Sequence, residues 1–191
     1  MKPILYNHAL VVGGSGMLSA ASLHLANSGV ITSVVGRDPS KIRKMQEHSF
    51  VFPGKIIPVI SDYTDIPQFI IDVIMTQESY GPVTLAVVWM HDTARTAPHH
   101  LAKLLNKHNC KFVHVLGSSL GESENKRLEL EKQFSEFEKI DYQQVILGHQ
   151  IENGESRWLT DLEISDGVVE AIISEEKMIT VGRPKPREER P

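Results

Sequence analysis

Three glycines within four positions, Gly13, Gly14 and Gly16, are the residues with the clearest chemical potential in this chain of 191 residues. They follow an apolar run over residues 9–12 and precede a helical pattern of apolar residues over 18–25. This order predicts a buried strand, a tight turn and a helix. Glycines allow a ligand to approach the backbone closely, and the free N–H groups at a helix start bind anions. Such a unit most often binds the pyrophosphate of a dinucleotide, and the alternative is a tight turn that binds nothing.

A basic side chain follows the second apolar run, residues 30–35. Arg37 stands where folds that bind NAD usually carry an acidic residue for the ribose 2′-hydroxyl. A guanidinium suits the 2′-phosphate of NADP, because its fork of donors fits a phosphate, and Ser40 and Lys41 follow closely. We therefore predict NADP as the cofactor. Asp38 would serve a ribose if the register shifted by one residue, and an exposed arginine without a ligand is the other alternative.

The remaining cofactor candidates follow the other predicted strands, because ligands of a parallel α/β sheet bind beyond the carboxyl ends of its strands. Asp62 and Tyr63 follow the third strand, where they would contact the adenine, or would simply start a helix. Trp89 ends the fourth strand and Gly148 follows the sixth. The cofactor-binding residues that we predict are Gly13, Gly14, Ser15, Gly16, Met17, Leu18, Arg37, Ser40, Lys41, Asp62, Tyr63, Trp89 and Gly148.

Three residues are candidates for catalysis. His91 follows the fourth strand, where it would face a nicotinamide, and histidine titrates near neutral pH. The hydroxyls of Ser118 and Ser119 follow the fifth strand. A packing role for His91 is the alternative. His91, Asp92 and the later pair His99-His100 show no recognised ligand spacing, so we predict no metal site.

The elements that must position these residues form an α/β pattern. Strand-like runs cover residues 9–12, 30–35, 55–60, 83–90, 111–116, 142–147 and 178–181, with helical patterns between most of them. We expect a Rossmann-type doubly wound parallel sheet of six or seven strands, with helices on both faces. Pro58 places the third strand at an edge. Residues 148–157 are predicted to form a polar loop, and Thr160 and Glu163 a capping box at the next helix.

Composition limits the function classes. The formal net charge of −4 gives no bulk attraction to nucleic acid or acidic membranes. The single cysteine, Cys110, excludes an internal disulfide framework and suits a reducing cytoplasm. The start of the chain lacks the apolar region of a signal peptide, and no run reaches transmembrane length. We predict one domain over residues 1–181 and a disordered tail over 182–191, which is rich in Pro, Arg and Glu.

Six segments resemble short-chain dehydrogenase/reductases in the order in which that family has them. They are LVVGGSGML, VVGRDPSK, PVISDYTD, LAVVWMHDTA, FVHVLGSS and VILG, within about residues 8–173. The chain resembles small, atypical members most closely. The resemblance implies a Rossmann fold, NADP binding and reductase activity, and it matches Ser118 or Ser119 with the substrate-binding serine of the family.

The chain also departs from the family pattern. The helix predicted over residues 122–139 has no tyrosine, although family members carry a Tyr-x-x-x-Lys pair there as a proton relay. Tyr142 lies beyond that helix and is followed four residues later by Ile146. Trp89-Met90-His91-Asp92 replaces the usual Asn-Asn-Ala-Gly. His91 is therefore our substitute proton donor.

Three functions follow as hypotheses. The first is an NADP-dependent oxidoreductase that reduces a small carbonyl or imine substrate. The second is a non-catalytic NADP-binding sensor or regulatory protein, and the third is a binder of nucleotide sugars or other phosphate ligands. Residues 148–159 are few for a substrate lid. This implies a small substrate, a partner subunit that completes the site, such as a second copy in a homo-oligomer, or no substrate.

Overall fold

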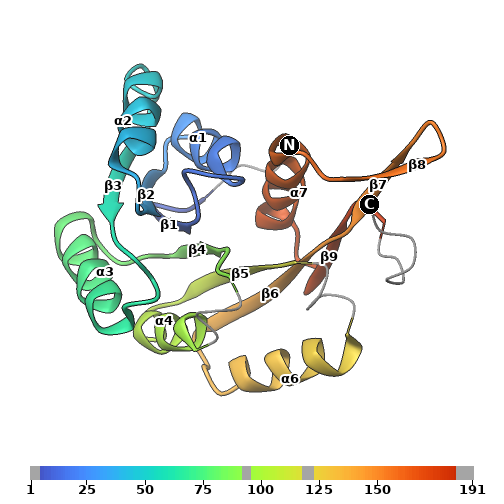
Figure 1. The fold of residues 1–191 in the computed structure, drawn as a ribbon. Coiled ribbons are helices and arrows are strands. Elements are labelled where there is room, and N and C mark those ends of the chain that lie inside the picture. Colours follow the sequence, from blue (N-terminus) through green and yellow to red (C-terminus); the bar gives the residue numbers. More distant parts are fainter. Residues whose placement is uncertain (1–4, 92–95, 118–122, 184–191) are drawn as a thin grey trace.

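The computed structural model describes residues 5–91, 96–117 and 123–183. Its centre is a seven-stranded sheet in which every pairing is parallel, in the order β3-β2-β1-β4-β5-β6-β9 (Figure 1). The strands are β1 (His8–Val12), β2 (Ile31–Gly36), β3 (Lys55–Ile60), β4 (Leu85–Val88), β5 (Cys110–Leu116), β6 (Ile140–Leu147) and β9 (Met178–Val181). The predicted fold class is confirmed, and β3 with its Pro58 lies at an edge of the sheet as expected.

Helices cover both faces of this sheet (Figure 1). One face carries α1 (Ser19–Asn27), α2 (Pro39–His48) and α7 (Asp161–Ile173), and the other carries α3 (Ile66–Tyr80), α4 (Ala97–Leu105) and α6 (Glu124–Phe134). Side chains alternate between the faces along a strand. In β1, Leu10 packs in the cluster that contains Phe69 of α3, whereas Val11 packs in the cluster that contains Leu25 of α1. Both sides of the central strands are therefore buried, which explains their continuous apolar sequences.

The chain order reverses beside β1. The strands β1, β2 and β3 follow one another in one direction, and the chain then crosses back so that β4 pairs with the free edge of β1. In open α/β sheets this reversal opens a crevice at the carboxyl ends of the two central strands, where ligands bind. The turn from β1 to α1, with its glycines, lies at that point.

Residues 149–158 form a hairpin, not the predicted polar loop. The strands β7 (His149–Glu152) and β8 (Glu155–Trp158) pair antiparallel and project beyond the main sheet (Figure 1). Asn153 and Gly154 connect them with φ values of 54° and 85°. An Asn-Gly pair is the preferred two-residue hairpin connection, because both of its residues adopt positive φ.

Some element ends also differ from the predictions. The strand predicted over residues 83–90 is hydrogen-bonded as β4 only over Leu85–Val88, and the helix predicted over 122–139 ends at Phe134. Gly182 and Arg183 of the predicted tail continue the ordered chain, and Arg183 forms a bridge with His149. Residues 184–191 lie outside the described ranges. Within those ranges no helix is long and apolar enough to span a membrane.

Candidate functional site

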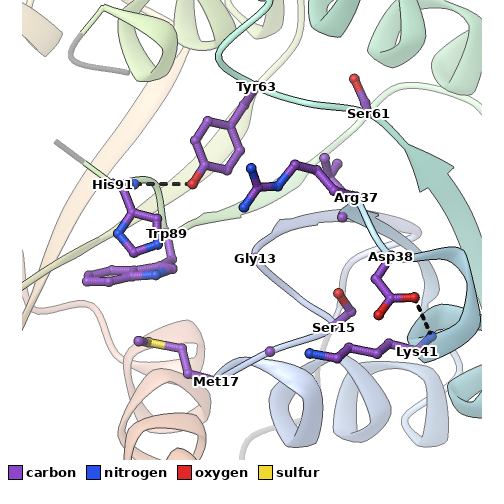
Figure 2. Close-up of a pocket in the computed structure, with 13 residues that line it drawn as sticks. Gly13, Ser15, Met17, Arg37, Asp38, Lys41, Ser61, Tyr63, Trp89 and His91 are labelled. Atoms are coloured by element: carbon purple, nitrogen blue, oxygen red, sulfur yellow. Dashed lines mark hydrogen bonds between the residues drawn. The ribbon is translucent and has the colours of Figure 1, made fainter. Parts of the chain in front are cut away.

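A cleft of about 500 Å³ opens at the carboxyl ends of β1, β2, β3 and β4 (Figure 2). Such a volume is in the ordinary range for small-molecule sites. The residues that line it are Gly13, Ser15, Gly16, Met17, Val35, Gly36, Arg37, Asp38, Lys41, Ser61, Tyr63, Trp89 and His91. Nine of these are predicted site residues, so the structure brings together most of the positions that the strand ends suggested.

The glycine turn shapes the floor of the cleft. Gly13 has a φ of +79°, which favours glycine, and its N–H donates to the Val35 carbonyl at 3.3 Å. At Gly16, an added Cβ would meet only the Gly13 carbonyl oxygen, at 3.7 Å, so the backbone there faces open space. The N-cap residue of α1 is Leu18, whose side chain makes no capping hydrogen bond. An anion in the cleft could therefore accept hydrogen bonds from the first turn of α1.

Five predicted cofactor residues do not line the cleft, and three of them, Gly14, Leu18 and Gly148, are placed by packing. An added Cβ at Gly14 would lie 2.7 Å from the Ser22 hydroxyl oxygen, so this glycine allows α1 to pack closely on β1. Leu18 is fully buried in the core. At Gly148 an added Cβ would lie 2.3 Å from the Arg183 carbonyl oxygen, so the chain after β9 occupies that side.

The β2 side of the cleft is basic. Arg37 follows β2, its side chain is 70% exposed, and its Nη1 lies 3.7 Å from Asp62 Oδ2. Lys41, at the start of α2, extends into the same region (Figure 2). A Cβ at Gly36 would lie 2.6 Å from the Ser15 hydroxyl oxygen, so this glycine lets Ser15 lie against the end of β2. These side chains offer two cationic groups and a hydroxyl to one ligand.

The nearby acidic side chains have structural partners. Asp38 caps α2, because its Oδ1 accepts from the Ser40 N–H at 2.9 Å, the Ser40 hydroxyl at 2.6 Å and the Lys41 N–H at 3.4 Å. The Ser40 hydroxyl, followed by its N–H, lowers the pKa of Asp38. Asp62 accepts from the N–H and hydroxyl of Thr64, and the N–H is the main cause of its lowered pKa. Asp38 therefore caps α2 and also lines the cleft, whereas neither Ser40 nor Asp62 lines it.

Aromatic side chains form the β4 side of the cleft. The Tyr63 hydroxyl accepts from the backbone N–H of His91 at 3.4 Å (Figure 2). The rings of Trp89 and His91 meet edge to face, with centroids 5.9 Å apart. His91 is exposed and lines the cleft, so its imidazole is open to a ligand. Ser118, Ser119 and Asp92 lie outside the described residues.

The described residues show where other titratable groups lie. All four tyrosines of the chain are described, and only Tyr63 lines the cleft. Tyr142 packs against the core, its hydroxyl is 3.0 Å from Nδ1 of His114, and burial raises its pKa. Burial also lowers the pKa of His114 to about 4. His99 does not line the cleft, and its Nε2 lies 2.5 Å from Oε1 of Glu136. Among the described residues, no three His, Cys, Asp or Glu side chains cluster as metal ligands would.

Four residues that line the cleft are not among the predicted site residues. Three of them, Val35, Gly36 and Ser61, were not considered as ligands, and Asp38 was considered only as an alternative ribose ligand. All four lie at or directly after the ends of β2 and β3. Their positions alone were the available signal, because neither their types nor their spacing matches a ligand-binding motif.

No protein-family model matches this chain, and no curated protein matches it in sequence. Solved structures match its fold. A metagenomic short-chain oxidoreductase in complex with NADP matches with a TM-score of 0.73 at 14% identity, over 97% of this chain and 100% of that one. An alcohol dehydrogenase from the archaeon Thermococcus sibiricus, complexed with 5-hydroxy-NADP, matches with a TM-score of 0.72 at 11% identity, over 94% and 99%. A β-ketoacyl-[ACP] reductase from Bacteroides thetaiotaomicron matches with a TM-score of 0.68 at 14% identity, over 92% and 96%. The chain therefore has the fold of these short-chain dehydrogenase/reductase structures, and this is the fold that the resemblance to that family implied.

Proposed function

We propose that the cleft binds NADP and that the protein is an oxidoreductase that reduces a small carbonyl or imine substrate. The observation that carries the proposal is the open space in front of Gly16 in the glycine turn, together with the cationic side chains of Arg37 and Lys41 that line the same cleft. The turn suits a pyrophosphate, and the cations suit a 2′-phosphate. Two structures of the same fold are described as holding NADP or 5-hydroxy-NADP, which supports this choice of ligand.

The chain's own residues would divide the work as follows. The glycine turn and the first turn of α1 would bind the pyrophosphate, and Arg37 and Lys41 the 2′-phosphate. Tyr63 would flank the adenine. NADPH, when bound, supplies a hydride. The His91 imidazolium would then donate the proton to the reduced substrate, because its ring lines the cleft beyond Trp89 and no tyrosine other than Tyr63 does.

A second candidate function is NADP binding without catalysis, because Tyr63 is the only tyrosine that lines the cleft. A protein that binds NADP without reducing anything, as a sensor or regulatory subunit, needs the glycine turn and Arg37 but not His91. The buried position of Tyr142 supports this alternative, because that hydroxyl is not available to a ligand in the cleft. We further propose a reducing compartment such as the cytoplasm, since the chain has a single cysteine, Cys110, and can form no internal disulfide.

Two measurements test these functions. Calorimetric titration should show binding of NADPH in preference to NADH, and failure of NADPH to bind would refute the NADP site. NADPH oxidation should then be followed with a panel of small aldehydes, ketones and imines. His91→Ala should retain NADPH affinity and lose roughly 10²–10⁴-fold in turnover. The matched control is His100→Ala, an exposed histidine on α4 outside the cleft. Binding without turnover in the wild-type protein would favour the sensor.

A further inference from the structure

The carbonyl groups of the glycine turn accept hydrogen bonds from the protein itself. The Gly14 carbonyl accepts from the Ser22 hydroxyl at 3.1 Å, and the Leu18 carbonyl accepts from the hydroxyl and the N–H of Ser22, both at 3.0 Å. The Gly16 carbonyl accepts from the Ser19 N–H at 2.9 Å. Each such bond fixes a peptide plane, because a carbonyl and the N–H that follows it lie on opposite sides of a trans peptide.

The Met17 carbonyl is held by a residue from a distant part of the chain. The Ser165 hydroxyl, on α7, donates to this carbonyl at 2.9 Å, across 148 positions of sequence. Ser165 is 1% exposed, so the bond is shielded from competing water. Met17 itself lines the cleft (Figure 2). Ser165 therefore fixes a peptide of the cleft wall from the side of α7.

The same peptide carries the N–H group of Leu18. Because the Met17 carbonyl is directed at Ser165, this N–H is directed away from Ser165. Within the described part of the chain no group accepts a hydrogen bond from it, although Leu18 is fully buried. A buried N–H without an acceptor costs free energy, and a ligand can supply the missing acceptor. The pyrophosphate of a dinucleotide that lies beside Gly16 and Met17 would do so.

We propose that Ser165 is a positioning residue of the dinucleotide site, which aims the Leu18 N–H at the pyrophosphate by holding the Met17 carbonyl. This inference rests on the proposed NADP site and gives α7 a part in binding. Ser165 would act through the glycine turn and would not touch the ligand. Its removal should weaken the contacts that NADPH and NADH share, and should leave the contacts of Arg37 and Lys41 with a 2′-phosphate intact.

The test is a calorimetric titration of NADPH, NADH and 2′-AMP, which has a 2′-phosphate but no pyrophosphate. Ser165→Ala should raise the dissociation constants of NADPH and NADH by the same factor, roughly tenfold, the lower end for one hydrogen bond to a charged group. 2′-AMP should bind within about twofold of the wild-type value. Ser165→Thr keeps the hydroxyl and should restore the affinity for both dinucleotides.

Ser33→Ala is the matched control. It also removes a buried hydroxyl, one that lies 2.8 Å from Nε2 of His8, and Ser33 does not line the cleft. This variant should lose stability and keep the wild-type affinity for all three ligands. A lowered melting temperature alone therefore does not account for a selective loss of the dinucleotides in Ser165→Ala.

A second readout does not depend on the folding of Ser165→Ala. In ¹⁵N-labelled wild-type protein, NADPH should move the amide proton of Leu18 downfield, and 2′-AMP should leave it in place. An unmoved Leu18 amide in NADPH-saturated protein, or wild-type affinity of Ser165→Ala for both dinucleotides, would overturn the inference and leave the NADP site intact. An equal loss of all three ligands in Ser165→Ala would also overturn it, because the serine would then only support the fold. Binding of no ligand by wild-type protein would overturn the NADP site and the inference together.

Discussion

Replacing Arg37 by alanine should weaken NADPH binding without weakening the fold. The guanidinium is 70% exposed, and its ion pair with Asp62 has an N–O distance of 3.7 Å. Exposed pairs of this kind contribute about 0–1 kcal/mol to the free energy of unfolding. The free protein therefore loses little when Arg37 is removed, and a change in ligand affinity will report on the ligand contact itself.

The expected magnitude follows from the contact that Arg37 would make. A charge-assisted hydrogen bond to a phosphate contributes about 1.5–3 kcal/mol, which corresponds to roughly a 10- to 150-fold change in dissociation constant. Arg37 must leave Asp62 to make that contact, so the lower part of the range is expected. NADH has no 2′-phosphate, and its affinity should stay within about twofold of the wild-type value.

The assay is a calorimetric titration of NADPH and NADH into wild-type, Arg37→Ala and Arg43→Ala proteins. Arg43 is a matched control, because it is exposed on α2 and does not line the cleft, and its replacement by alanine removes the same charge. Raising the salt concentration should reduce the wild-type preference for NADPH, since an exposed charge pair is screened. Equal NADPH affinity in wild-type and Arg37→Ala proteins would refute the assignment of Arg37. If Arg37→Ala lost as much affinity for NADH as for NADPH, Arg37 would contact a part of the dinucleotide that both cofactors share.

Two further predictions concern the glycine turn and the core. Gly16→Val should fold normally but lose NADPH binding, because the added side chain would enter the cleft. Gly13→Ala should lower the melting temperature of the protein, since φ is +79° at Gly13 and the added Cβ would lie 3.1 Å from Cδ1 of Trp89. Normal NADPH binding by Gly16→Val would show that the turn binds no pyrophosphate. The pKa of His114 is about 4 in the folded protein, below the ordinary 6.5, so the unfolded chain binds the proton first as pH falls. Urea unfolding should show stability that is complete above pH 6.5 and falls by up to about 3 kcal/mol toward pH 4. His114→Gln should flatten this dependence, leaving the smaller contribution of His8, whose pKa burial also lowers, and an unchanged slope would contradict the assignment.

The sheet could be predicted because its signals are local. The strand of residues 55–60 and the last strand, 178–181, have the predicted bounds, since polar or glycine-containing segments flank each apolar run. The hairpin was missed although its Asn153-Gly154 turn is a strong local signal, because residues 149–158 lack the alternation of apolar and polar residues that marks a half-buried strand. The hairpin is formed by its two-residue turn and its backbone pairing, and not by the burial of one apolar face.

The sequence could predict a residue of the cleft only where the position of the backbone decides whether that residue lines it. Arg37 and Tyr63 line the cleft because they directly follow strands that end at the same edge of the sheet. The separate roles of Gly14 and Gly16 could not be read from their identical type, since one faces Ser22 and the other faces open space. The direction of the Trp89 ring depends on Gly117, which is 28 positions later in the chain, so no local pattern contains it.

The segment after β6 bears on how a substrate could be held. In place of a long lid the chain has the β7–β8 hairpin, and Arg157 of β8 anchors it. The Arg157 guanidinium donates to both carboxylate oxygens of Glu163 in α7, at 2.9 and 3.0 Å, and its Nε donates to Glu152 at 2.5 Å. These bonds from Arg157 are the main cause of the low pKa of Glu163, about 2, so this carboxylate stays charged across the physiological range.

A hairpin fixed in this way is a poor candidate for a closing lid, because a bidentate contact specifies one geometry. Figure 1 shows it projecting beyond the sheet instead of lying over the ends of β1 and β4. A substrate in the cleft would therefore have to be held by residues other than those of the hairpin, none of which lines it.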